Sequence, residues 1–269
     1  MSKYVSYLEI AKMLKRIQKG DVVYVVSDIL ELVKETREHG ERFDRDLFLT
    51  SLQEAVGEEG TLLIPTFNWD FCKGIPFDYH HTACKTGALG NAALGRKDFI
   101  RTKHPIYSFA VWGRDAEYLF EQDEPNSFGE NSIFDYMYKK AAKALVIGLD
   151  AMDGLTFMHH VEQMVGVPFR FVKNFTAPYT DWEGKTATRT YTMYVRDLDM
   201  DAQENSKHFS QILEDLNVSF TQQINHVPFR TVLLRQVYDI EAMDIRYNDS
   251  RNLYVYKGQQ KKEVTDNHE

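Results

Sequence analysis

VVYVVS, residues Val22–Ser27, is a nearly continuous apolar run, as a strand buried on both faces of a sheet requires. Similar runs follow at TLLIPTF (Thr61–Phe67), YSFAVWG (Tyr107–Gly113) and ALVIGLD (Ala144–Asp150). Segments with helical spacing lie between these runs, for example Asp44–Val56, which begins with a residue able to cap a helix. Strands that alternate with helices predict an α/β fold with a largely parallel central sheet flanked by helices.

The pattern changes after Pro168, where polar and apolar residues begin to alternate. Phe169–Thr176 and Thr186–Arg196 show this alternation, which is typical of strands with one face in solvent. The sequence Asp181-Trp182-Glu183-Gly184 lies between them and is typical of a turn. We therefore expect an antiparallel hairpin in the C-terminal part of the chain.

The chain of 269 residues is long enough to bury a full core, and its 43% hydrophobic and 27% charged residues are an ordinary globular composition. No linker rich in Pro, Gly or Ser divides it. We expect one domain over residues 1–258, in which residues from about 169 to 258 form the antiparallel elaboration. Residues 259–269 are polar and charged, and we expect a disordered tail there.

Charge and composition also exclude classes of partner. The net charge of −8, without a basic stripe, disfavours nucleic acid, whereas an acidic surface suits a cationic substrate. No apolar run approaches the ~20 residues of a membrane span, and residues 1–21 lack the apolar middle of a signal peptide. Cys72 and Cys84 are too few for a disulfide scaffold. We therefore expect a cytoplasmic protein without a membrane partner.

Several common catalytic motifs are missing from the sequence. It contains neither G-x-x-x-x-G-K-[ST] nor G-x-G-x-x-G, and also lacks G-x-S-x-G, H-E-x-x-H and C-x-x-C. His80, His81 and Cys84 are the nearest approach to a metal cluster, but a zinc site needs further ligands that the local sequence does not supply. Two solvated histidines in a loop are the favoured interpretation, and no metal is expected.

Two polar stretches are candidates for ligand contacts. Thr86-Gly87 opens a segment of small residues, and a helix beginning there would present free N–H groups to a phosphate or an oxyanion. Arg101–Ser108 leads into the third apolar run and places His104 before a proline, which favours an extended conformation. The plain alternatives are a capped helix start for the first stretch and a solvated loop for the second.

A third stretch, Thr156–Glu162, follows the fourth apolar run. On a helix, His159 and Glu162 are three residues apart and share a face. The carboxyl edge of a parallel sheet is where α/β proteins bind ligands, and a histidine oriented by a carboxylate is the usual general base. An exposed His–Glu pair without function remains open on spacing alone.

In this order, the stretches resemble the aminoglycoside 3-N-acetyltransferase family, which has the antibiotic acetyltransferase fold. The resemblance extends from about Val22 to beyond Pro168. Each motif is weak alone, but their order and spacing together are specific. The matching segments are GTLLIPTF (60–67), TGAL (86–89), RTKHPIYS (101–108), Gly148, TFMHHVE (156–162) and VPF (167–169).

The resemblance implies acetyl-CoA as co-substrate, an amine of an amino sugar as acceptor, and direct transfer without an acetyl-enzyme. It implies that His159 is the catalytic base and Glu162 its carboxylate partner. Family members carry a His-Ser-Ser-like sequence after the first strand, and here only Ser27 matches it. The candidates for contacts to acetyl-CoA are Ser27, Thr86, Gly87, Arg101, Lys103, His104 and Ser108.

Other interpretations remain open. The acceptor is a nucleotide-linked amino sugar of surface polysaccharide synthesis if Arg170, Lys173 and Arg189, near the hairpin, meet a diphosphate. A catalytically silent protein that binds CoA or a partner protein is a further alternative, although intact His159 and Glu162 disfavour it. A homodimer is compatible with the sequence.

Overall fold

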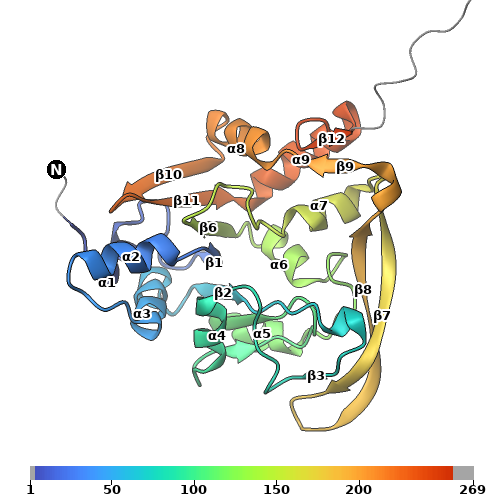
Figure 1. Cartoon of the computed structure of the whole chain (residues 1–269), viewed down its shortest axis with the longest axis horizontal. Coiled ribbons are helices and arrows are strands. Elements are labelled where there is room, and N and C mark those ends of the chain that lie inside the picture. The colour runs from blue at the N-terminus through green and yellow to red at the C-terminus, as the bar shows by residue number, and fades with distance from the viewer. Residues whose placement is uncertain (1–3, 257–269) are drawn as a thin grey trace, which may run out of the picture.

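A seven-stranded sheet with the strand order β10-β11-β6-β1-β2-β5-β4 forms the centre of the fold (Figure 1). The structure is a computed structural model, and it describes residues 4–256. The expected tail, 259–269, therefore lies outside the described residues. The strands of this sheet are β1 (Val22–Ser27), β2 (Thr61–Pro65), β4 (Ile100–Arg101), β5 (Phe109–Gly113), β6 (Lys143–Ile147), β10 (Ser219–Ile224) and β11 (Val227–Leu233).

The middle of the sheet is parallel and its flanks are antiparallel. Strand β1 pairs in parallel with β2 and β6, whereas β5 runs antiparallel to β2 and β11 antiparallel to β6. The expected α/β fold with an antiparallel C-terminal elaboration is confirmed. Strand β5 reverses because the chain returns to the sheet at the end where β2 stops, so that Phe109 pairs with Pro65.

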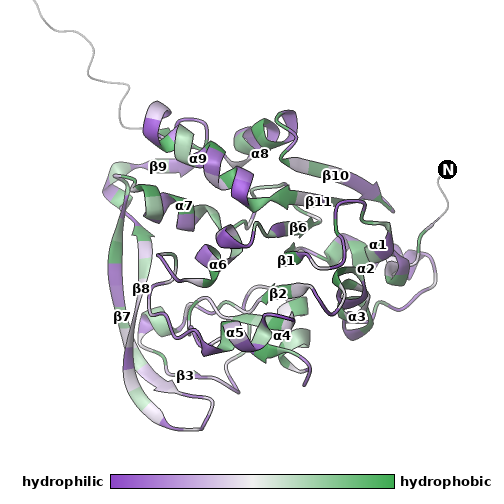
Figure 2. Ribbon diagram, turned by 180° about the vertical axis from the view of Figure 1, so that it is seen from behind, coloured by the Kyte–Doolittle hydropathy of each residue, from purple (hydrophilic) through white to green (hydrophobic). Residues whose placement is uncertain are grey.

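Helices cover both faces of the sheet, and each face has its own apolar cluster. Side chains along β1 point alternately to the two faces of the sheet. Val23 and Val25 therefore belong to one cluster, and Val22, Tyr24 and Val26 belong to the other. Figure 2 shows these central strands as the apolar interior between helices of mixed hydropathy. The first cluster lies under α1 (Tyr7–Met13), α2 (Leu30–Glu38), α3 (Arg45–Val56) and α4 (Ala88–Leu94), and the second under α5 (Ala116–Glu121), α6 (Ile133–Lys139), α7 (Met158–Val165), α8 (Ser206–Asp215) and α9 (Leu234–Asn248).

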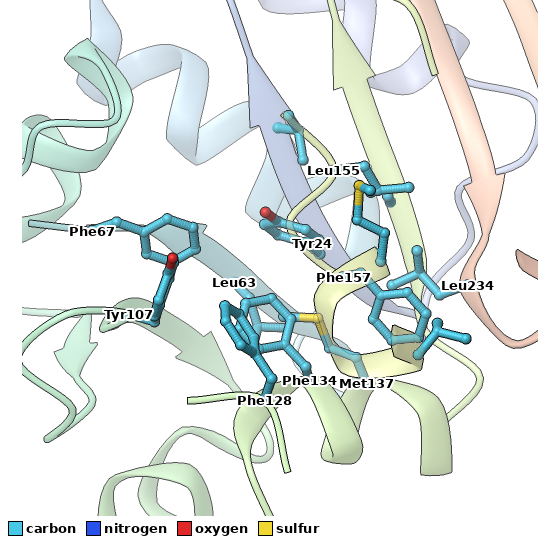
Figure 3. Packing of buried hydrophobic residues seen from close by; sticks show 14 of the residues in the cluster. Tyr24, Leu63, Phe67, Tyr107, Phe128, Phe134, Met137, Leu155, Phe157 and Leu234 are labelled. Carbon is cyan, nitrogen blue, oxygen red and sulfur yellow. The ribbon is translucent and has the colours of Figure 1, made fainter. Parts of the chain in front are cut away.

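The second cluster is rich in aromatic rings. Phe128, Phe134 and Met137 pack at its middle, while Phe67 and Tyr107 lie to one side of them (Figure 3). The rings meet mostly edge to face; the Phe67 and Tyr107 centroids, for example, are 4.9 Å apart at 73°. This is a favourable geometry for aromatic pairs. The cluster therefore provides a rigid support beneath the helix that carries His159.

A long hairpin lies along one side of the molecule (Figure 1). It consists of β7 (Arg170–Thr180) and β8 (Thr186–Arg196), and β3 (Phe77–Asp78) pairs with the far end of β7. Asp181 closes the turn, since one of its carboxylate oxygens accepts hydrogen bonds from the backbone N–H groups of Glu183 and Lys185. The hairpin expected from the sequence is thereby confirmed.

The remaining elements are two short strands, which pair with each other, and two 3-10 turns. They are β9 (Ala202–Glu204), β12 (Tyr254–Tyr256), η1 (Phe71–Lys73) and η2 (Leu198–Met200). Strand β12 follows α9 and brings the end of the described chain back to the start of the hairpin, since Tyr254 contacts Arg170 at 3.2 Å. Within residues 4–256, no helix has the length and apolar character that crossing a membrane requires.

Candidate active site

The candidate base lies at the carboxyl edge of the parallel strands. Ser27 at the end of β1 pairs with Ile147 at the end of β6, so the segments that follow these strands begin side by side. Gly148 turns the chain directly after β6, with a φ of 74°, and a Cβ at this position would collide with the backbone oxygen of Asp28. The loop after this turn leads into α7, which carries His159 and Glu162.

His159 and Glu162 form a hydrogen-bonded pair on one turn of α7. Nδ1 of His159 lies 2.8 Å from Oε2 of Glu162. A carboxylate at this distance favours the tautomer with the proton on Nδ1, which leaves Nε2 as a bare acceptor. Nε2 has no hydrogen-bond partner among residues 4–256. The His159 side chain is 21% exposed, so this nitrogen is within reach of a ligand.

Glu162 is fully buried and is held by three groups. Besides His159, the hydroxyl of Tyr254 donates to Oε1, and Nε of Arg170 lies 2.8 Å from Oε2. The Nε–H group of Arg170 is not aligned as a hydrogen bond, so this contact is an ion pair. Burial alone would raise the pKa of Glu162, but the hydrogen bond from His159 and the charge of Arg170 outweigh it, and the pKa is lowered. Glu162 is therefore an ionised partner for His159.

A groove opens at the end of β1, the edge of the sheet at which the loop leading to α7 also begins. Its volume is about 620 Å³, and Ser27, Gly87 and Arg45 line it together with apolar side chains of α2. The structure thus brings together Ser27 and Gly87, which the sequence analysis proposed separately. Thr86 lies beside Gly87 and donates a hydrogen bond from its hydroxyl to the carbonyl of Pro65.

The stretch Arg101–Ser108 has a different environment, since its polar side chains are buried and most of their polar atoms contact other parts of the protein; Nη2 of Arg101 is the exception, without a partner among residues 4–256. Arg101 donates hydrogen bonds to the backbone oxygens of Tyr79 and Thr82. Ser108 bonds Thr66. Nε of Arg101 donates a hydrogen bond to Oγ of Ser108 at 3.2 Å. Neither residue lines the groove beside Ser27.

Lys103 and His104 are also enclosed. The ammonium group of Lys103 lies 4.1 Å from the centroid of the Trp182 ring and 4.5 Å from that of Phe120. Nδ1 of His104 accepts hydrogen bonds from the backbone N–H groups of Ile106 and Tyr107. The polar groups of these two candidates for acetyl-CoA contacts are therefore in contact with other parts of the protein.

Most of the chain matches one known protein family. A family model described as aminoglycoside 3-N-acetyltransferase matches residues 37–243, which is most of the chain. The chain belongs to the aminoglycoside 3-N-acetyltransferase family. The enzyme class expected from the sequence, an acetyl-CoA-dependent N-acetyltransferase, is confirmed by this membership.

Individual relatives are more distant. The chain is 24% identical over 229 residues to the SPbeta prophage-derived aminoglycoside N(3')-acetyltransferase-like protein YokD of Bacillus subtilis (strain 168), covering 76% of this chain and 80% of the relative. It is 19% identical to the structure of AAC-IIIb binary with CoASH, with a TM-score of 0.73 over 91% of this chain and 98% of the other. The sisomicin-bound AAC-VIa structure is 20% identical, with a TM-score of 0.73 over 91% and 99% of the two chains. At such identities the structures share a fold.

Sequence reasoning missed most of the surroundings of Glu162 in this acetyltransferase family member. Arg170 was considered only as a diphosphate contact in the alternative with a nucleotide-linked acceptor, and it is the ion-pair partner of Glu162. Tyr254 and Glu241 were not singled out. Tyr254 is 92 residues from Glu162 along the chain, and no periodic pattern links the two. The alternation over Phe169–Thr176 was the one available signal, because it places Arg170 near the start of a strand.

The three residues of the zinc hypothesis do not converge. Nε2 of His80 contacts the carbonyl of Trp182, whereas Nδ1 of His81 lies 2.9 Å from Asp78. Cys84 is buried and its sulfur lies 3.1 Å from the hydroxyl of Thr86. Over residues 4–256, the structure holds no group of three or more His, Cys, Asp or Glu side chains arranged to bind a metal ion.

The buried imidazole of His104 is expected to make the folded state of this acetyltransferase less stable in acid. Burial lowers the pKa of its imidazole to about 3, from 6.5. The unfolded chain then binds a proton that the folded chain excludes, so stability is lost as pH falls from about 6.5 towards about 3, by up to about 1.4 kcal/mol per pH unit. Urea unfolding at several pH values should show a shallower acid loss for His104→Asn, whose side-chain oxygen can still accept from the backbone. Equal slopes would show that His104 does not contribute.

Proposed function

We propose that this protein acetylates a primary amine of an amino sugar, in the manner of an aminoglycoside 3-N-acetyltransferase. The observation that carries the proposal is the free Nε2 of His159, whose other nitrogen is bonded to a buried, ionised carboxylate. This is the arrangement of a general base. The loop that leads to α7 starts at the sheet edge where the groove beside Ser27 opens, which supports a donor and an acceptor that meet at this edge.

In the proposed reaction, the neutral amine nitrogen of the acceptor attacks the thioester carbonyl carbon of acetyl-CoA. Nε2 of His159 accepts the proton that the nitrogen loses, and Glu162 stabilises the imidazolium. The C–S bond then breaks, and the CoA thiolate leaves and takes up a proton. Cys72 and Cys84 have no part in this direct transfer.

Acetyl-CoA is proposed to bind in the groove at the end of β1. Apolar side chains of the α2 region suit the pantetheine arm, and Arg45 supplies a positive charge for phosphate. Ser27 and Gly87 are the groove residues predicted from the sequence, and Thr86 supports Gly87. Direct contacts from Arg101, Lys103, His104 and Ser108 stay predictions; these residues are buried and lie outside the lining of the groove.

The acceptor side is proposed to lie over an aromatic cluster that begins at His159. The ring of Phe128 lies 5.3 Å from that of His159, Tyr107 lies 4.7 Å from Phe128, and Trp69 lies 6.3 Å from Tyr107. Phe128 and Tyr107 are buried and support the cluster, whereas Trp69 is 38% exposed at its outer end. An exposed indole face attracts cationic amines, which supports an amine-rich acceptor.

The proposed position of acetyl-CoA in the groove can be tested by filling the groove. Ala88 is exposed and lines the groove, so Ala88→Trp should fill it without disturbing the core. The KM for acetyl-CoA is expected to rise at least about tenfold, the equivalent of about 1.4 kcal/mol of lost binding. Steady-state thiol release measures it, with Lys97→Trp, exposed beyond the same helix, as the matched control. An unchanged KM would place the donor elsewhere.

The experiment that tests the proposed function is thiol release from acetyl-CoA with two panels of acceptors. One contains aminoglycosides and the other nucleotide-linked amino sugars. We expect release with aminoglycosides, because two of the three cations proposed for a diphosphate are committed to carboxylates: Arg170 to Glu162, and Arg189 to Asp123 at 3.2 Å. Release with nucleotide sugars alone would assign the enzyme to polysaccharide synthesis and overturn the proposed acceptor.

A further inference from the structure

Glu241 is a buried acid without a partner. It lies in the middle of α9, is 1% exposed, and neither carboxyl oxygen has a hydrogen-bond partner within residues 4–256. Buried carboxyl groups are normally bonded, because an unsatisfied one is unfavourable. By contrast, Asp244, one turn further along α9, bonds the backbone N–H groups of Asn252 and Leu253. Glu241 has no such structural task.

The surroundings of Glu241 are those of the candidate base. Helix α9 packs closely on α7, and the charged groups that act on Glu241 are Glu162 of α7, Arg170 of β7, Glu204 of β9 and Asp244 of its own helix. The single cation of this set is shared: Arg170 pairs with Glu162 at 2.8 Å and also approaches Glu204 at 3.7 Å.

The other elements that pack on α9 direct their charged groups elsewhere. From α6, Asp135 pairs with Lys139 at 2.7 Å. From β11, Arg230 pairs with Asp150 at 3.0 Å. No second cation among the described residues is therefore placed to stabilise a negative charge on Glu241.

We propose that Glu241 is a positioning residue for the His159–Glu162 pair: it stays protonated on α9, the helix packed against α7, so that Arg170 remains committed to Glu162, and its ionisation sets the alkaline limit of the enzyme. An ionised Glu241 would compete with Glu162 for Arg170. The Nε–H group of Arg170 is not aligned as a hydrogen bond to Glu162. The two side chains are therefore held together by charge alone, and a second carboxylate could compete for Arg170.

The electrostatics agree with this arrangement. Burial first, and then the negative charges of Glu162 and Asp244, raise the pKa of Glu241 well above its usual value, while Arg170 opposes this effect only in part. Above that pKa the proton passes to solvent and a second negative charge appears beside Glu162. Arg170 then has to neutralise both Glu162 and Glu241, and the hydrogen bond between Glu162 and His159 is weakened.

The inference rests on the proposed role of His159 and is tested by the pH profile of kcat/KM for Glu241→Gln. The variant keeps the shape of the side chain but cannot ionise. We expect the alkaline decline of kcat/KM to be smaller in Glu241→Gln than in wild type, by at least about threefold at the highest pH at which both proteins stay folded, since ionisation changes tenfold per pH unit. Asp239→Asn, exposed on the same helix, should keep the wild-type decline. A wild-type decline in Glu241→Gln would overturn the inference.

Two further measurements keep the test decisive. Glu241→Met, which is also neutral and of similar length, makes the same comparison if the glutamine variant does not fold. Infrared difference spectra between wild type and either variant should contain the C=O stretch of a protonated carboxyl group at neutral pH; its absence would overturn the inference independently of catalysis. If His159→Ala remains active, the proposed base fails, and the infrared band alone then decides whether Glu241 holds a proton.

Discussion

Replacement of His159 by alanine is expected to lower kcat for amine acetylation at least about a hundredfold, because general base catalysis by a positioned side chain contributes about 10²–10⁴-fold. Affinity for CoA should remain near wild type, since His159 does not line the groove beside Ser27. Thiol release measures the first quantity and isothermal titration with CoA the second. An unchanged kcat would remove His159 from the mechanism.

The neighbouring histidine provides the matched control. His160 is buried, and its Nδ1 contacts the backbone oxygen of Phe128 at 2.7 Å. An asparagine amide can donate the same bond, so His160→Asn should keep kcat within about threefold of wild type, a difference of less than about 1 kcal/mol. Because the two residues are adjacent, the pair of variants decides which histidine of the doublet is the base. A loss in His160→Asn as large as that in His159→Ala would contradict the assignment.

The second large effect is on stability. Replacement of Arg170 by methionine leaves Glu162 buried at the centre of the protein without its cation, and removal of one partner of a buried ion pair typically costs about 3–5 kcal/mol. Urea unfolding at neutral pH should show a loss of this size in the free energy of unfolding. The double variant Glu162→Gln with Arg170→Met should recover part of it, because no uncompensated charge then remains.

A control on the same hairpin separates this effect from general damage to β7 and β8. Arg196 pairs with Glu204, but both side chains are one-third exposed. Solvent screens such pairs, so Arg196→Met should cost less than about 1 kcal/mol. Equal losses in the two variants would show that the pair of Arg170 with Glu162 is not specially important.

Sequence patterns were informative where the relevant interactions are local. The run Val22–Ser27 is buried along almost its whole length, and the Asp44 side chain caps α3 by accepting from the backbone N–H groups of Asp46 and Leu47. His159 and Glu162 were predictable as a pair because one helical turn joins them. The antiparallel direction of β5 was not predictable from the sequence, because it depends on where the intervening chain re-enters the sheet and not on the residues of the strand itself.

The rest of the site depends on contacts between distant parts of the chain. Tyr254 and Arg170 reach Glu162 from β12 and β7, while Glu241 lies on α9, which packs on the helix of Glu162; each is an ordinary residue in its own local pattern. The same holds for Arg101 and Lys103, which appear as exposed cations in sequence but are enclosed by backbone carbonyls and aromatic rings in the fold. Burial of a charge is a property of the assembled core, so it has no signature in a short motif.

The position of Arg170 has a consequence for how such an enzyme diverges. It is the first residue of β7, and it is also the counter-ion of the carboxylate beside His159. A change that reshapes the start of β7 therefore also alters the charge beside the proposed base. Changes in the hairpin and changes in turnover are thus expected to evolve together, so that a lineage with an altered hairpin would first lose rate and recover it through later substitutions around Glu162.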